Sequence, residues 1–195
     1  MIYLTVKTII DRLFALVSLI IFFPLFLLFA LMIKLESKGP VFFVQERVGR
    51  HQKTFKMIKF RTMKEGAPEQ IPADLFVEVD KWLTKMGRFL RRTSLDELPQ
   101  LINILKGDMS LIGPRPGLLN QTELIRKRSL ESVYELYPGI SGYAQVNGRN
   151  LNTEDEKVAL DKYYLENLSL WLDIKIFFKT FTVMFRQEND KKNGK

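Results

Sequence analysis

The sequence predicts a mainly helical α+β protein that is attached to a membrane near its N-terminus. Three observations support this fold class. Residues 13–33 form an apolar run without a charge, two short β-branched and aromatic stretches flank a turn between residues 41 and 60, and several later segments place apolar residues at helical spacing. These features divide the chain into a membrane anchor at 1–36, a folded domain at 37–187 and a flexible tail at 188–195.

The apolar run is long enough to cross a bilayer, because a helix rises about 1.5 Å per residue and the hydrocarbon core is roughly 30 Å thick. No small-residue cleavage site follows it, so a signal peptide is a poor interpretation. Pro24 lies near its middle and should bend or break the helix. Lys7 and Arg12 precede the run, and Lys34 and Lys38 follow it, so both ends carry charge that favours the cytoplasm. A kinked spanning helix and a re-entrant helix are both compatible with this pattern.

The two short stretches, Val41–Gln45 and Thr54–Phe60, predict a small β-hairpin with its turn in RVGRHQ. Residues 79–94 predict an amphipathic helix with a strongly basic opposite face. This helix could lie in the membrane interface or pack on an ordinary core. Its apolar face comprises Trp82, Leu83, Met86, Phe89 and Leu90.

Further helices are predicted along the rest of the chain. A short helix should end near Gly107, another should cover residues 119–131, and two more should cover 153–166 and 170–186. The last is aromatic and basic, which is typical of a helix that touches a bilayer. A short strand between two turns is expected within YPGISGYAQVNGRN.

Composition restricts the chemistry that the protein can perform. Thirty Lys and Arg residues against 22 acidic residues give a net charge of +8, which favours nucleic acid, acidic lipid or a phosphorylated substrate as partner. The absence of cysteine excludes thiol nucleophiles, disulfides and thiolate zinc sites. The single histidine, His51, lies in a basic turn and does not suggest a catalytic triad. Carboxylates, cations and a metal held by oxygen remain.

The stretch TSLDELPQL places Asp96 and Glu97 together after a group of arginines. Ser94 and Glu97 match a helix capping box. Pro99 argues against that cap, because it would then occupy a helical position where its missing N–H is needed. A helix start at Asp96 or later puts Pro99 in the first turn, where proline is tolerated. Capping would explain one carboxylate but not the cations around two.

Two arginines lie in turns that suit phosphate binding. In GPRPG, Pro114 and Pro116 restrict the backbone on both sides of Arg115, whose planar guanidinium can bind phosphate in a bidentate manner. In NGRN, Arg149 lies between Gly148 and an asparagine. Either motif alone could be an ordinary turn.

The chain resembles the small monotopic phosphoglycosyl transferases, the bacterial sugar transferases that start glycan assembly on polyprenol phosphate. The resemblance covers nearly the whole sequence and is carried by FKMIKFRTM, SLDELPQLINILKGDMSLIGPRP, PGISGYAQVNGRN and LDKYYLENLSLWLDIKI. Two positions depart from the family pattern. Phe23 precedes the helix-breaking proline where many members have serine, and Gly117 follows PRP where many have a larger residue.

The resemblance implies a re-entrant anchor broken at Pro24, interfacial helices and a small β-element, all exposed only to the cytoplasmic face of a bacterial inner membrane. It implies transfer of a phospho-sugar from a UDP-sugar to polyprenol phosphate with release of UMP. Asp96 would be the nucleophile, and Glu97 would bind Mg²⁺ together with Asp96 or position the lipid phosphate. Arg115 and Arg149 would clamp the pyrophosphate. Further candidates for phosphate or nucleotide binding are Lys59, Arg61, Arg91 and Asp173.

A different interpretation is a membrane-anchored basic module that binds acidic lipid or nucleic acid without catalysis. The cations lack the aromatic interleaving of a single-strand platform, and such a module does not need the acidic pair, so nucleic acid is not expected as a partner. An inactive regulatory homologue would not need the acidic pair and both arginines. Asp108 is interpreted as a turn residue. The sugar, the glycan pathway, the polyprenol length and the oligomeric state stay open; a homo-oligomer and downstream glycosyltransferases are the protein partners to consider.

Overall fold

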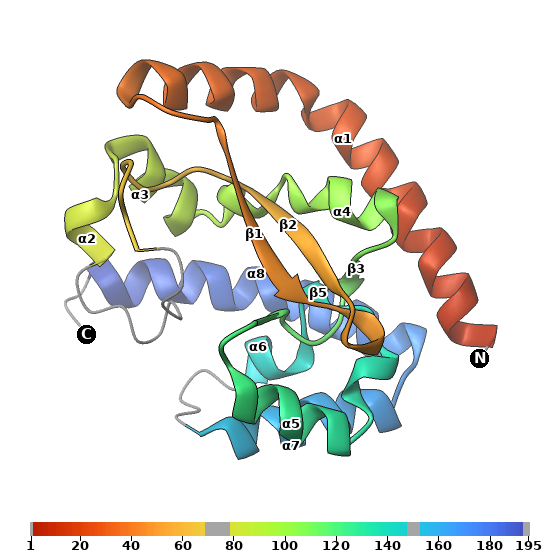
Figure 1. The fold of residues 1–195 in the computed structure, drawn as a ribbon. Coiled ribbons are helices and arrows are strands. Elements are labelled where there is room, and N and C mark those ends of the chain that lie inside the picture. The colour runs from red at the N-terminus through yellow and green to blue at the C-terminus, as the bar shows by residue number, and fades with distance from the viewer. Residues whose placement is uncertain (1, 69–78, 148–152, 193–195) are drawn as a thin grey trace.

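Helix α1 runs from Ile2 to Glu36 in the computed structural model, which describes residues 2–68, 79–147 and 153–192 (Figure 1). The helix continues through Pro24, and its axis changes direction along its length, as a proline inside a helix predicts. By length and composition α1 could cross a membrane. One face is exposed and apolar, with Ile20 68% and Phe23 59% accessible, whereas Ala15 and Ile33 on the other face are buried.

The predicted hairpin is confirmed. Strands β1 (Phe42–Val48) and β2 (Thr54–Phe60) pair antiparallel, and the turn between them contains the short 3-10 helix η1 (Arg50–Gln52). Strand β4 (Gly117–Leu118) pairs with the other edge of β1. A separate parallel pair joins β3 (Ser110–Ile112) to β5 (Gly139–Ser141), which includes the short strand expected in this region.

The predicted helix at 79–94 is wrong in one respect, because it is broken in two. Helix α2 (Val79–Trp82) and helix α3 (Lys85–Arg92) are separated by an extended step in which Leu83 bridges to Met63. Thr84 then caps α3 by accepting a hydrogen bond from the Gly87 amide at 2.9 Å. A Cβ atom at Gly87 would lie 1.9 Å from the Thr62 carbonyl oxygen, so glycine permits this close approach.

The remaining helices follow the predicted order. Helix α4 (Gln100–Lys106) ends at Gly107, whose φ of 84° suits glycine. Helices α5 (Thr122–Leu130), α7 (Glu154–Glu166) and α8 (Leu170–Lys192) occupy the other predicted segments. Helix α8 continues to Lys192, through most of the predicted tail. Strands β3 and β4 were not predicted, nor were the 3-10 helix η3 (Val133–Glu135) and helix α6 (Tyr143–Asn147). Helix α6 lies in a segment where the sequence predicted a short strand and a turn.

Helix α4 lies between α1 and the hairpin (Figure 1), and a core of Ala15, Met57, Leu101 and Ile104 fills the space between them. Asn103 of α4 is completely buried. Its side-chain amide donates to the Lys56 carbonyl at 2.7 Å and its carbonyl accepts from the Ile58 amide at 3.0 Å. One α4 side chain therefore replaces a neighbouring strand along β2 and fixes the position of the hairpin relative to α4.

The N-terminal half of α1 is attached to the domain by buried polar contacts. Lys7 Nζ lies 2.7 Å from Asp173 of α8 and 3.3 Å from Asp11. The Ser110 hydroxyl donates to Asp11 at 2.5 Å, and the Tyr164 hydroxyl donates to Asp173 at 2.6 Å. Because an unpaired buried charge is costly, this network fixes α1 on β3, α7 and α8.

Candidate functional site

The acidic pair lies in η2 (Leu95–Glu97), a 3-10 turn between α3 and α4. Ser94 adopts a left-handed conformation with φ of 54°, and its side chain makes no capping hydrogen bond. The capping-box alternative is therefore contradicted. Helix α4 begins after Pro99, which stands at its N-cap position, so Asp96 and Glu97 lie outside the helix N-terminus as the position of the proline predicts.

Glu97 is held by cations from two other segments. Lys59 of β2 lies 2.5 Å from Glu97 Oε1, and Arg115 Nη1 lies 3.7 Å from the same oxygen. Burial opposes ionisation of Glu97, but Lys59, Arg115 and Arg47 outweigh it and hold the pKa of Glu97 below its usual range. Glu97 is therefore a paired, ionised carboxylate at neutral pH.

Asp96 has a different environment, although it is the adjacent residue. Its exposed fraction is 8%, and among the residues that the structure describes none donates a hydrogen bond to its carboxylate. Burial and the charge of Glu97 raise the pKa of Asp96 to about 6, while Lys59 and Arg91 oppose that shift. Asp96 is therefore a carboxylate whose oxygens are not occupied by a described partner, which suits a nucleophile or a metal ligand.

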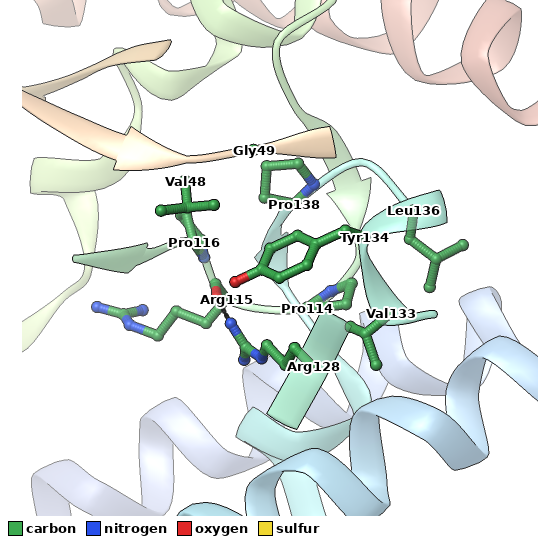
Figure 2. A pocket seen from close by; sticks show the side chains of 10 residues that line it. All are labelled: Val48, Gly49, Pro114, Arg115, Pro116, Arg128, Val133, Tyr134, Leu136 and Pro138. Carbon is green, nitrogen blue, oxygen red and sulfur yellow. Dashed lines mark hydrogen bonds between the residues drawn. The ribbon is translucent and has the colours of Figure 1, made fainter. Parts of the chain in front are cut away.

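The loop that carries Arg115 is held at three successive carbonyls. The Pro114 carbonyl accepts from the Gly139 amide at 2.9 Å, the Arg115 carbonyl accepts from Arg128 at 2.8 Å, and the Pro116 carbonyl accepts from Arg47 at 3.2 Å. Figure 2 shows the Arg128 side chain reaching the main chain of Arg115, while the Arg115 side chain points away from the small pocket behind the loop. The loop thus presents one half-exposed guanidinium from a fixed backbone.

The structure brings together four of the predicted site residues around Asp96: Glu97, Lys59, Arg115 and Arg91, the last acting through its charge. It places two others elsewhere. Arg61 is buried beneath the turn after α1, where its guanidinium donates to the Ser37 and Lys38 carbonyls, and Asp173 lies in the network with Lys7. Both side chains are engaged in structural contacts, and their predicted role in phosphate or nucleotide binding stays a prediction.

Two other sequence predictions concern residues around the site. Arg149 falls outside the part of the chain that the structure describes. Asp108 accepts a hydrogen bond from the buried Asn103 amide at 3.2 Å, so it orients a structural residue, in agreement with its interpretation as a turn residue.

A divalent metal can be tested against the donors that are present. Among the described residues no group of three acidic or histidine side chains could hold a metal ion. Asp96 and Glu97 are nevertheless adjacent oxygen donors, and Mg²⁺ often binds through one or two carboxylates together with substrate phosphates. The open Asp96 carboxylate fits that role, and the cations nearby suit a phosphate.

Sequence reasoning missed several residues that support the site. Asn103 positions β2, Arg47 holds the Pro116 carbonyl, and Arg128 forms an ion pair with Asp161 at 2.7 Å. No local motif marks them. Arg128 follows two other cations, Arg126 and Lys127, in an ordinary surface-like run, and only the fold shows that it is the buried one.

Cations surround a buried carboxylate pair on a domain that packs against a long apolar helix, an arrangement that suits a membrane-attached protein acting on phosphorylated groups. Over residues 2–187 the sequence matches the bacterial sugar transferase family. The chain belongs to this family.

Three relatives illustrate the similarity. A UDP-N-acetylgalactosamine-undecaprenyl-phosphate N-acetylgalactosaminephosphotransferase of Aeromonas hydrophila is 43% identical over 92% of this chain and 43% of its own length. A UDP-glucose:undecaprenyl-phosphate glucose-1-phosphate transferase of Caulobacter vibrioides is 40% identical over 94% of this chain and 71% of its own. The exopolysaccharide production protein ExoY of Rhizobium meliloti is 39% identical over 87% and 81%. The chain therefore spans less than half of the Aeromonas relative.

Proposed function

We propose that the protein transfers a phospho-sugar from a UDP-sugar to a membrane polyprenol phosphate and releases UMP, at the first membrane step of glycan synthesis. The activities named for the Aeromonas and Caulobacter relatives support the donor and the lipid class. The observation that carries the proposal is the environment of the acidic pair. Asp96 is buried and receives no hydrogen bond from the described residues, and beside it Glu97 is ionised and paired with cations.

The reaction proceeds in two displacements at one carboxylate. An Asp96 oxygen attacks the phosphorus that carries the sugar, forms an O–P bond, and breaks the bond between that phosphorus and the bridging oxygen, so UMP leaves with the electron pair. A phosphate oxygen of the lipid then attacks the same phosphorus. The Asp96–phosphorus bond breaks, the carboxylate is restored, and the product is a polyprenyl diphosphate sugar. A carboxylate needs no separate base for this attack once it is ionised.

The surrounding residues overcome the repulsion between the nucleophile and an anionic substrate. Arg115 presents a planar fork that suits phosphate oxygens, and Arg91 and Lys59 add positive charge near Asp96. Glu97, held by Lys59, would be the second metal ligand or would position the lipid phosphate. Mg²⁺, held by Asp96 and Glu97, would supply charge neutralisation on the pyrophosphate.

The packing of α1 supports attachment to one face of the membrane. Lys7 near one end of the helix and Ile33 near the other are both buried against the same domain, with exposed fractions of 8% and 2%. A spanning α1 would force part of that basic domain into the bilayer, which is costly for charged groups. This packing supports a re-entrant anchor, as proposed, with the domain at the cytoplasmic face of the inner membrane. The exposure of Trp171 and Phe178, 64% and 65%, supports a place for α8 in the membrane interface.

The activity is tested by incubating the purified protein in detergent with Mg²⁺ and a panel of UDP-sugars, with and without undecaprenyl phosphate. The proposal predicts UMP release with at least one sugar. It also predicts that labelled UMP exchanges into that UDP-sugar without any lipid acceptor, because the first displacement is complete before the lipid binds. Failure of every sugar to release UMP, together with salt-sensitive binding of acidic lipid, would favour a non-catalytic binding module.

A further inference from the structure

We infer that the buried ion pair Arg128–Asp161 is a positioning element of the site, which acts by fixing the main chain of Arg115. The inference rests on the proposed transferase function for its kinetic consequences. Arg128 belongs to α5 and Asp161 to α7, and neither side chain contacts the acidic pair in any described interaction.

The geometry of Arg128 divides its donors between two partners. Nε donates to Asp161 Oδ2 at 2.9 Å, and Nη2 lies 2.7 Å from the same oxygen in the ion pair. Nη1 donates to the Arg115 carbonyl at 2.8 Å. The guanidinium is planar, so a carboxylate that holds two of its nitrogens also fixes the direction of the third. Figure 2 shows this side chain extending from α5 to the loop. Asp161 thus determines where the Arg115 carbonyl lies.

The degree of burial distinguishes this pair from ordinary surface charges. The exposed fractions of Arg128 and Asp161 are 4% and 1%, whereas the side chains of the neighbouring pairs Arg126–Glu123 and Lys162–Glu131 are about half-exposed. A buried ion pair is weak evidence for stability, because well-packed apolar residues often replace it without loss. Here the ion pair orients a hydrogen-bond donor toward the Arg115 carbonyl, which apolar side chains could not do.

The carbonyl at the centre of the loop has the greatest influence on the Arg115 side chain. The Pro114 carbonyl before it is fixed by the β5 backbone, and the Pro116 carbonyl after it is fixed by Arg47. Pro116 restricts ψ of Arg115, but ψ of Pro114 and φ of Arg115 are not fixed by either proline ring. The hydrogen bond from Arg128 to the Arg115 carbonyl restrains these two torsions. Loss of that bond lets the guanidinium leave the position near Glu97 that it now occupies.

The test uses the double variant Arg128→Met/Asp161→Leu, which removes both charges together and leaves no unpaired buried ion. Its matched control is Lys162→Met/Glu131→Leu, which removes a half-exposed pair between the same two regions. Hydrogen exchange of the peptide covering residues 113–118 needs no substrate. We expect this exchange to become at least about tenfold faster in the double variant and to stay unchanged in the control, with both proteins melting as cooperatively as wild type.

The kinetic test is a mutant cycle that combines the double variant with Arg115→Ala, and kcat/KM for UMP release is measured for each protein. Alone, the double variant should lower kcat/KM by about 10-fold to 100-fold, the order expected for a misplaced catalytic group. In the Arg115→Ala background the same double variant should have no further effect, because the pair acts through Arg115. Arg128→Lys, which keeps a charge for Asp161 but not the fork, provides the same cycle if the double variant does not fold.

The outcomes separate this inference from the proposed function. Absence of UMP release by the wild type contradicts the proposed function, and hydrogen exchange then still decides whether the pair restrains the loop. Unchanged loop exchange contradicts the inference. So does a loss of kcat/KM that is equally large with and without the Arg115 side chain.

Discussion

At the residue scale, two adjacent carboxylates differ because the fold gives them different neighbours. Glu97 points to Lys59 and Arg115 and is ionised, whereas Asp96 is buried without a described hydrogen-bond donor. Each carboxylate also raises the cost of charging the other. The fold therefore keeps Glu97 as a fixed anion, whereas the ionisation of Asp96 depends on the positive charges near it.

The raised pKa of Asp96 predicts how its replacement changes stability. A carboxyl group whose pKa is about 6 in the native state and near 4 in the unfolded state costs stability as pH rises from 4 to 6. In EDTA and without substrate, Asp96→Asn should raise the free energy of unfolding by about 1–3 kcal/mol at pH 7.5 and by little at pH 4. Urea titrations at both pH values measure this. A variant less stable than wild type at pH 7.5 would contradict the electrostatic account, and the exposed Asp155→Asn serves as control.

The pairing of Glu97 predicts the opposite pH dependence. Its lowered pKa means that the stabilisation is present above the ordinary glutamate value and is lost as pH falls through the native value. Lys59→Met should therefore cost about 2 kcal/mol at pH 7, and less in strong acid, because Glu97 loses its nearest cation. Chemical unfolding across pH 3–7 tests this. If Lys59→Met and the half-exposed control Lys162→Met lower the free energy of unfolding equally, the Lys59–Glu97 pair stabilises the protein no more than a surface ion pair.

At the element scale, the site depends on how α4 holds the edge of β2. Asn103 satisfies a carbonyl and an amide of that strand, and Lys59 follows directly along it. Asn103→Leu should lower the free energy of unfolding by about 2–4 kcal/mol, because it leaves two buried backbone groups unpaired. Activity at a temperature where the variant is folded should also fall. Thermal unfolding compares it with Asn167→Ala, an exposed helix-end asparagine expected to cost little. Similar melting temperatures for the two variants would contradict this role.

The accuracy of sequence-based prediction also varies from element to element. The hairpin, α4, α7 and most of α8 could be predicted, because alternation, helical spacing and a terminal glycine are local signals. The break between α2 and α3 could not. Its cause is pairing of Leu83 with Met63 and contact of Gly87 with Thr62, and such distant contacts leave no periodic pattern.

The same division applies to the site. Asp96, Glu97 and Arg115 stand in short motifs with unusual residue types, so the sequence predicts them. Arg61 has a similar motif position, yet its guanidinium is used by the Ser37 and Lys38 carbonyls. Whether a basic residue binds substrate or holds a turn depends on tertiary packing.

At the scale of the whole molecule, the anchor helix packs on the domain along its length and is not a separate helix joined to it by a flexible linker. Both halves of α1 pack on the domain, from Lys7 to Ile33, while its other face is apolar and exposed. In the proposed function, this arrangement would bring the carboxylate pair of a basic domain to a lipid surface, within reach of both a soluble nucleotide sugar and a lipid phosphate.

This arrangement predicts that the two ends of α1 lie on one side of the membrane. The chain has no cysteine, so single cysteines can be introduced without background. In spheroplasts, Thr5→Cys and Lys38→Cys should both resist an impermeant maleimide and should both react after lysis, like a control cysteine at Glu166 on the domain surface. Labelling of Thr5→Cys but not of Lys38→Cys in intact spheroplasts would show a spanning helix instead.

The central claim is that an Asp96 oxygen becomes bonded to phosphorus during turnover. The most direct measurement is intact-protein and peptide mass spectrometry after incubation with Mg²⁺ and the accepted UDP-sugar, in the absence of lipid. The account predicts a mass increase of one phospho-sugar on the peptide that contains Asp96, its disappearance when undecaprenyl phosphate is added, and its absence in Asp96→Asn but not in Asp155→Asn. A phospho-sugar adduct that persists in Asp96→Asn, or one found on another residue, would contradict the account.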